Sequence, residues 1–299
     1  MSKAIFSTRV TPSYDDRPEE YYHFPSTYLN QVKAAVGDQI IYYEPRRQDS
    51  SLSSKGGRQA YFATAQVTGI RADPKNPGHY YAEIANYLPF TRPVPFREAG
   101  HYYESRLGNE TDGTNLGTAR RSVRNLPDSE FDLILRSGFA PVLAEDQPAK
   151  IIAPNQLDDP GDEFRRPIVE MTIQRPFRDR AFKFAVREAY DNRCALTGLR
   201  LINGGGRPEV EAAHIKPVAD NGPDTIRNGL ALSGTVHWMF DRGLVSVGDD
   251  YEILISKNRV PDDALRLLNA NGHVNLPKDS TLYPNGHYLK FHRDTIFKS

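Results

Sequence analysis

The sequence predicts an α+β protein of two domains joined by a linker, and three observations lead to this prediction. Residues 1 to about 105 contain strand-like runs of aromatic and β-branched residues, separated by Pro and Gly. Residues 147–167 contain four prolines and a cluster of acidic residues, which is typical of a linker. The rest combines an amphipathic helix with a strand–turn–strand–helix pattern. We therefore expect domains at 1–146 and 168–299.

The overall composition is that of a folded protein with enough apolar residues for two cores. The chain has 299 residues, of which 38% are hydrophobic and 25% charged, and its formal net charge is zero. A neutral chain is not a strongly basic protein that coats DNA. Local basic patches remain compatible with this balance, because affinity for phosphate depends on where the charges cluster.

The single cysteine, Cys194, excludes intrachain disulfides and a zinc site built from four thiolates. We expect it to be a small buried residue. The first ten residues lack the apolar core of a signal peptide, and no apolar run reaches the length that a membrane span requires. These features predict a cytoplasmic protein with no membrane partner.

The first domain is predicted to be a small barrel. Strands are expected at 37–43, 60–70 and 79–88, where aromatic and β-branched residues concentrate between turn residues. A short helix is expected at 25–35. The polar stretch 48–57 is predicted to be a loop, and loops on a rigid barrel often bind ligands.

The second domain is predicted to contain strands and helices in a compact order. The segment 177–190 has apolar residues at helical spacing and is predicted to be an amphipathic helix. Residues 209–215 alternate as a strand does, and 229–232 is predicted to be its partner. Residues 235–242 are expected to form the first part of a helix. A further helix is expected near 129–135, before the linker.

Four segments of the second domain, taken in order, resemble the HNH endonucleases. They are Cys194-Ala-Leu-Thr-Gly198, Glu211-Ala-Ala-His-Ile215, Arg227-Asn-Gly-Leu-Ala-Leu232 and His237-Trp-Met-Phe-Asp-Arg-Gly-Leu244. The active unit of that family is a ββα-metal finger. The resemblance covers roughly residues 175–260. It implies hydrolysis of DNA phosphodiester bonds by activated water, with one divalent metal ion.

The residues themselves are compatible with that chemistry. His214 is predicted to be the general base, because a neutral imidazole takes a proton from water at neutral pH. Asn228 is predicted to hold the loop or the imidazole in place. His237 and Asp241 lie four residues apart on a predicted helix, so they share a face and are candidate metal ligands. Many family members have a metal-binding Asp or His where this chain has Ala213.

Ala213 cannot bind a metal, so the second protein ligand beside His237 must come from elsewhere. Two carboxylates are candidates for it. They are Glu211, two residues before Ala213, and Asp241. A site of His and carboxylate ligands suits Mg²⁺ or Mn²⁺, with Ni²⁺ or Co²⁺ as alternatives. No structural zinc is expected, because Cys194 stands alone where many relatives have two Cys-x-x-Cys pairs. The finger is expected to be held by Trp238, Phe240 and the 177–190 helix.

The first domain resembles the PUA-like barrels, particularly the EVE and SRA-like readers of modified bases. The resemblance rests on the segments 36–43, 62–70 and 87–96. It implies that a modified cytosine is flipped into a pocket and stacked between aromatic rings. The predicted pocket residues are Tyr22, His23 and Tyr43. The predicted DNA-phosphate contacts are Arg46, Arg47, Lys216, Arg227 and Arg242.

Together, the two halves resemble modification-dependent restriction endonucleases. The resemblance implies binding of double-stranded DNA that contains 5-methylcytosine or 5-hydroxymethylcytosine, and cleavage nearby. One finger cuts one strand, so a homodimer is expected, at least on DNA. Two alternatives stay open. One is an HNH nuclease without modification dependence, and the other is a non-catalytic protein that binds modified DNA. The intact His214, Asn228 and His237 argue against a decayed finger.

Overall fold

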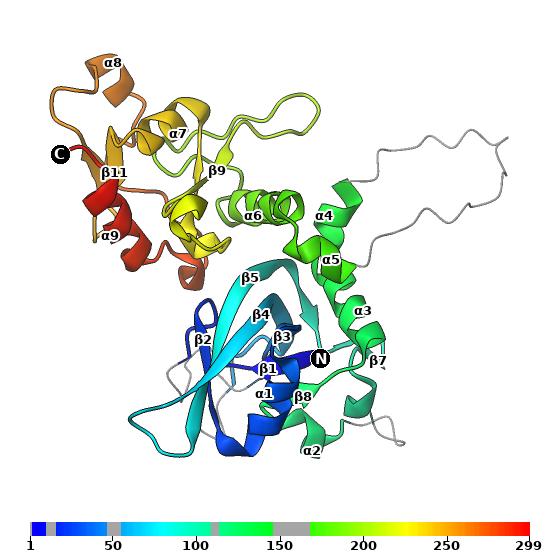
Figure 1. Ribbon diagram of the computed structural model, residues 1–299. Helices are drawn as coiled ribbons and strands as arrows, with labels where there is room; N and C mark the ends of the chain where they lie inside the picture. The colour runs from blue at the N-terminus through cyan, green and yellow to red at the C-terminus, as the bar shows by residue number, and fades with distance from the viewer. Residues whose placement is uncertain (1, 10–15, 47–54, 109–113, 146–167) are drawn as a thin grey trace, which may run out of the picture. The chain divides into compact units, whose positions relative to one another are not determined.

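The computed structural model describes residues 2–9, 16–46, 55–108, 114–145 and 168–299 (Figure 1). The chain divides into two compact units, Met1–Arg178 and Asp179–Ser299. The expected linker at 147–167 lies outside the described residues. Residues 168–178, which the sequence-based division assigned to the second domain, belong by their contacts to the first unit. None of the described helices is long and apolar enough to cross a membrane.

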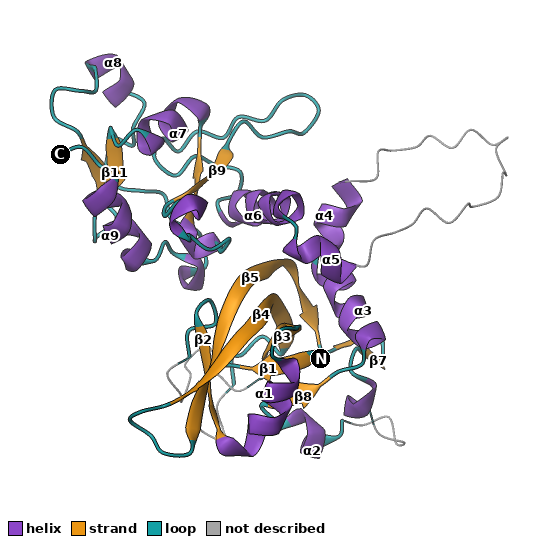
Figure 2. Ribbon diagram, viewed as in Figure 1, coloured by secondary structure: helices purple, strands orange, loops and turns teal. Residues whose placement is uncertain are grey.

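The first unit is built on a curled six-stranded sheet (Figure 2). Its strand order is β2-β5-β4-β3-β1-β8, with β1 parallel to β3 and the other neighbours antiparallel. Three register shifts interrupt the long β4–β5 pair, and such irregularities bend strands. The strands are β1 (Ala4–Ser7), β2 (Tyr21–Pro25), β3 (Gln39–Glu44), β4 (Ala60–Ala72), β5 (His79–Pro95) and β8 (Val123–Asn125).

The predicted strands at 37–43, 60–70 and 79–88 are confirmed, and the observed β5 is longer than expected. The predicted helix at 25–35 is a turn of 3₁₀ helix followed by α1 (Leu29–Ala35). The structure establishes a curled sheet in a mixed α/β unit. The PUA-like barrel remains a prediction. A short hairpin joins β6 (Arg97–Glu98) to β7 (His101–Tyr102).

Helices complete the first unit, and they are α2 (Leu116–Ala119), α3 (Asp128–Gly138), α4 (Ala140–Glu145) and α5 (Ile168–Ile173). α3 confirms the helix predicted near 129–135. α5 is tied to the sheet by Thr172, whose hydroxyl accepts a hydrogen bond of 3.0 Å from the Gln39 side chain. The sheet and α1 enclose a core that contains the fully buried Phe6, Ile40 and Tyr42.

The second unit is organised around a strand–strand–helix finger. β9 (Glu211–His214) and β10 (Gly229–Leu232) are antiparallel, and they pair His214 with Gly229 and Glu211 with Leu232. α7 (Gly234–Asp241) follows directly, so the predicted ββα order is confirmed. The remaining elements are α6 (Arg175–Ala189), which belongs to this unit from Asp179 on, β11 (Val245–Val247), β12 (Ile253–Ile255), α8 (Asp262–Leu265) and α9 (Gly286–Thr295).

Packing holds the finger, as expected, but not through every predicted residue. Phe240 is buried, and α6 contributes Phe182 and Val186 to the same core, which also contains the free Cys194. Trp238 was expected to join them, and this expectation is wrong because its side chain is 58% exposed. On the short α7, the core takes Val236, Met239 and Phe240, and Trp238 falls on the outer face.

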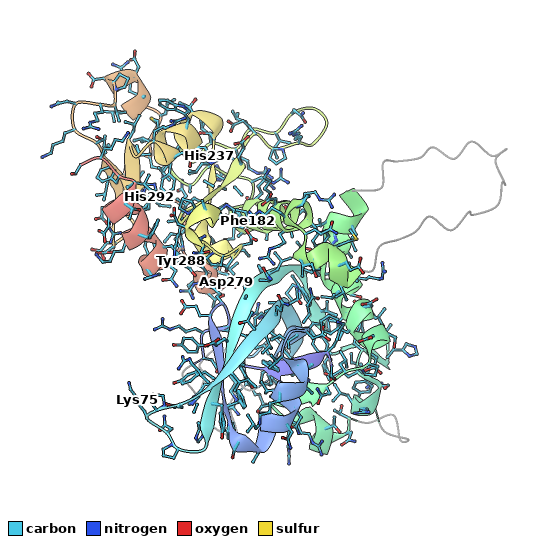
Figure 3. All side chains as sticks on the ribbon, in the orientation of Figure 1. Lys75, Phe182, His237, Asp279, Tyr288 and His292 are labelled. Atoms are coloured by element: carbon cyan, nitrogen blue, oxygen red, sulfur yellow. The ribbon has the colours of Figure 1, made fainter. Side chains whose placement is uncertain are left out.

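A buried histidine on α9 gives the second unit a pH-dependent stability. His292 lies on α9 (Figure 3). It is stacked on Phe240 with ring centroids 3.8 Å apart. Its Nε2 donates a hydrogen bond to the Phe240 carbonyl at 3.1 Å, and its Nδ1 accepts one from the Ser246 hydroxyl at 2.8 Å. The pKa of His292 is lowered from 6.5 to about 4, mainly by burial and to a smaller extent by the nearby Arg293, while the hydrogen bond to the Phe240 carbonyl acts in the opposite direction.

We expect the second unit to lose stability as the pH falls from about 6.5 to about 4. In this window the unfolded chain binds a proton at His292 that the folded chain does not, so acid favours unfolding. The loss would reach roughly 3 kcal/mol at the lower end. Urea unfolding, followed through the fluorescence of the single tryptophan, measures it at several pH values. His292→Gln should flatten this dependence, whereas the exposed His287→Gln should keep it. An unchanged slope in His292→Gln would contradict the prediction.

Candidate active site

His214 lies at the end of β9 and is held on two sides. Its Nε2 lies 3.0 Å from Oδ1 of Asp224, whose side chain is almost completely buried. Its ring is stacked on Phe182 of α6, with centroids 3.8 Å apart and ring planes 13° apart. Gly229 makes this stack possible, since a Cβ there would lie 2.5 Å from Val186 and 3.1 Å from Phe182.

The contact with Asp224 determines what the His214 ring can do. An ionised carboxylate only accepts hydrogen bonds, so the proton of the neutral ring is on Nε2 and the lone pair is on Nδ1. Among the described residues, no protein group bonds to Nδ1. This tautomer is the one that a general base for water needs.

Asn228 holds the loop that precedes it, and its side-chain contacts are with that loop rather than with the imidazole. The residue is completely buried. Its amide donates to the carbonyls of Lys216 and Pro223, both at 3.0 Å, and accepts from the amide of Lys216 at 2.9 Å. These three bonds close the 216–223 loop. Asp224 follows this loop directly, so Asn228 fixes the segment that delivers the carboxylate to His214.

His237 of α7 lies between two carboxylates. Its Nδ1 is 2.9 Å from Oε2 of Glu211 on β9, and its Nε2 is 3.5 Å from Oδ2 of Asp241, one helical turn further on. Both carboxylates are more than half exposed. The structure therefore brings together the three residues that the sequence offered as metal ligands.

These residues fit a lightly held divalent ion rather than a complete protein cage. In the part of the chain that the structure describes, no three His, Cys, Asp or Glu side chains converge on one point. Mg²⁺ commonly takes one or two protein ligands, several waters and substrate phosphates. The two carboxylates contact different ring nitrogens, which point away from each other. One metal ion can therefore be shared by His237 and only one of them.

A cleft of about 630 Å³ adjoins His237 and Glu211. β9 contributes Glu211 and Ala212, α6 contributes Lys183 and Arg187, and the segment 201–210 supplies most of the remaining lining. Neither Asp241 nor His214 lines this cleft. The cleft therefore opens on the Nδ1 side of His237, where Glu211 lies.

The predicted phosphate contacts lie elsewhere. Lys216 has its ammonium 5.1 Å from the ring centre of Phe291, and Arg227 donates through Nε to the Tyr283 carbonyl at 3.4 Å. Arg242 is exposed beside Trp238. In the first unit, Arg46 is exposed just after β3, and Arg47 lies outside the described residues.

The three predicted pocket residues are buried, and each packs against different neighbours. Tyr22 belongs to the core, and its hydroxyl donates to the Ser7 carbonyl at 3.0 Å. His23 is stacked on Tyr81 with centroids 4.5 Å apart, and its Nε2 is 3.0 Å from Asp73. Tyr43 packs against Tyr61, and burial raises its pKa to about 12.

Asp224, Phe182 and the cleft cations Lys183, Arg187 and Arg207 were not predicted from the sequence. Asp224 follows Gly222-Pro223 and has the pattern of a turn residue. Its role depends on the path of the loop, for which the sequence contains no signal. Phe182 lies on the amphipathic helix that was predicted at 177–190, but nothing in the sequence indicated that it would contact His214.

Residues 194–248 match the model of the HNH endonuclease family. This match spans β9, β10 and α7 and includes His214, Asn228 and His237. The resemblance of this part of the second unit to the HNH endonucleases is therefore confirmed.

Two solved structures are similar to the chain over most of its length. One is the modification-dependent TagI restriction endonuclease, with 14% identity and a TM-score of 0.30, covering 98% of this chain and 81% of that one. The other is the type IV phosphorothioation-dependent restriction endonuclease ScoMcrA, with 16% identity and a TM-score of 0.22, covering 90% and 52%. Likeness at these values defines neither the fold nor the function of this chain. No curated protein matches the sequence.

Proposed function

We propose that the chain is a modification-dependent DNA endonuclease that hydrolyses phosphodiester bonds with one divalent metal ion. The proposal of nuclease activity is supported by two histidines within residues 194–248, each of which contacts a carboxylate. His214 is paired with Asp224, and His237 is paired with Glu211.

In this proposal His214 takes the proton from the attacking water through Nδ1. Asp224 keeps the ring in the required tautomer and stabilises the imidazolium that forms. Asn228 holds the loop that carries Asp224. His237 and Glu211 hold the metal, which would be Mg²⁺ or Mn²⁺, with Ni²⁺ or Co²⁺ as alternatives. The metal supplies positive charge to the scissile phosphate and the leaving oxygen.

The first unit is proposed to read 5-methylcytosine or 5-hydroxymethylcytosine by flipping the base. This part rests on the resemblance of its sequence to PUA-like readers. Tyr22, His23 and Tyr43 are proposed as the stacking residues, and their burial means that the sheet must open locally to admit a base. Arg46, Arg47, Lys216, Arg227 and Arg242 are proposed to contact phosphates of the double-stranded DNA. Two copies are proposed to act together on DNA, one for each strand.

Digestion of matched plasmids tests the function. The substrates are one plasmid sequence carrying cytosine, 5-methylcytosine, 5-hydroxymethylcytosine or its glucosylated form, each with Mg²⁺ or Mn²⁺. We expect cleavage of a modified plasmid and little cleavage of the unmodified one. Equal cleavage of all forms would favour an HNH nuclease without modification dependence. Binding of modified DNA without any cleavage would favour a non-catalytic binding protein.

A further inference from the structure

Three cations line the cleft beside His237 without acidic partners. Lys183 and Arg187 lie one turn apart on α6, and Arg207 lies on the segment between Cys194 and β9. Among the ion pairs of the described residues, none involves these three. Other cations of the same unit are paired, as Lys290 is with Asp294 at 2.8 Å. Three unpaired cations around one cleft indicate a site for an anion.

The segment that carries Arg207 is an ordered hairpin. The amide of Asn203 bonds to the carbonyl of Arg207 at 3.0 Å, and the amide of Glu209 bonds to the carbonyl of Leu201 at 2.9 Å. Oδ1 of Asn203 accepts from the amides of Gly205 and Arg207, which closes the tip. In Figure 1 this hairpin is the yellow-green loop that projects beyond β9. Arg207 is therefore held by backbone geometry.

Both carboxylates that line the cleft already accept hydrogen bonds or pair with a histidine inside the second unit. Oε1 of Glu209 accepts a hydrogen bond of 2.8 Å from the amide of Gly234, where α7 begins, and Glu211 is paired with His237. Three cations face two engaged carboxylates, so the lining carries a net positive charge before any metal is counted. Leu201 and Ile202, which are 53% and 42% exposed, give the same cleft an apolar wall.

We propose that this cleft holds the sugar–phosphate backbone of the DNA strand that is cut, next to the scissile phosphate. Lys183, Arg187 and Arg207 contact phosphates, and Leu201 and Ile202 lie against the sugars. The proposal rests on the proposed nuclease function and adds the path of the strand. A backbone site of this kind provides affinity and register without reading sequence.

The test compares two double variants that remove the same kinds of charge. Lys183→Ala/Arg207→Ala removes two of the three positive charges that line the cleft. Lys257→Ala/Arg259→Ala removes one lysine and one arginine that are exposed on the same unit and do not line the cleft. Binding of a fluorescein-labelled duplex is measured by anisotropy without divalent metal, so that cleavage does not interfere. The duplex is used in unmodified and 5-hydroxymethylated form, at several salt concentrations.

Each lost phosphate contact lowers the slope of log affinity against log salt by about 0.9, and at about 50 mM salt it costs on the order of 10-fold in affinity. We therefore expect the cleft variant to bind both duplexes about 100-fold more weakly, with a slope lower by about 2. The control variant should stay within about twofold of the unaltered protein. Lys183→Arg/Arg207→Lys, which keeps both charges, should restore most of the affinity.

Two outcomes would overturn the proposal. One is equal binding by the cleft variant and the control variant. The other is weaker binding with an unchanged salt slope, which indicates a loss of folding rather than of phosphate contacts. Both differ from failure of the proposed function, which is the absence of cleavage by the unaltered protein with Mg²⁺ or Mn²⁺. The metal-free binding measurement does not depend on that result.

Discussion

His214→Ala is expected to lower the rate of DNA cleavage by about 10²- to 10⁴-fold, the range that a general base contributes. The structure gives the reason, because the ring is fixed by Phe182 and Asp224, while none of the described residues bonds to its Nδ1. Affinity for DNA should change little, since the side chain is mostly buried and does not line the cleft. Single-turnover cleavage and metal-free binding measure the two quantities separately.

A chemical rescue and a control variant separate a chemical role of His214 from a structural one. The alanine leaves a ring-sized space against Phe182, so added imidazole should restore part of the rate. His287→Ala, an exposed histidine on α9, should cleave normally. Full activity of His214→Ala would refute the assignment of the base.

The same experiment defines Asp224 as a positioning residue. Asp224→Asn should slow cleavage by about 10- to 100-fold, the usual effect of losing the partner that orients a functional histidine. In the His214→Ala background the same change should have almost no effect, because its only route to the reaction is removed. A loss that is equally large in both backgrounds would show that Asp224 acts on the fold and not through His214.

The sequence predicted local structure well where periodicity and turn residues determine it. The alternation around β9, the loop that follows it and the helical spacing of His237 and Asp241 were enough for the ββα order. Helical spacing also placed Asp241 on the same face as His237. Glu211 was a candidate for a different reason, because it lies two residues before Ala213, where the HNH resemblance implies a metal ligand. Only the structure shows that they contact different nitrogens of one ring.

Contacts between distant segments could not be read from the sequence. Asp224 reaches His214 only because the buried Asn228 folds the intervening loop, and Phe182 reaches it because Gly229 lets α6 approach. The predicted burial of Trp238 was wrong for a related reason. Hydrophobicity predicts burial on average, but on the short α7 the direction of each side chain decides which apolar residues enter the core. The direction of the side chain was equally uncertain for Tyr43, which was predicted to line a base pocket and is buried.

Glu211→Gln is expected to weaken binding of Mn²⁺ by more than about 100-fold, and Asp241→Asn by about 10-fold. The first carboxylate lies 2.9 Å from Nδ1 of His237 and lines the cleft, so it is placed to bind the metal directly. The second lies 3.5 Å from Nε2, outside the cleft lining, so its expected role is to orient the ring. Titration of free Mn²⁺ by electron paramagnetic resonance measures both affinities.

Cleavage at high metal concentration then distinguishes a residue that binds the metal from one that only orients His237. Asp241→Asn should recover most of its rate when Mn²⁺ is raised, because the ligands themselves are intact. Glu211→Gln should stay slow, since the metal lacks a carboxylate next to the scissile phosphate. Glu209→Gln is the matched control, because it lines the same cleft but bonds to Gly234. If Asp241→Asn were the more damaging change, the metal would lie on the Nε2 side of His237. The cleft would then be separate from the catalytic centre.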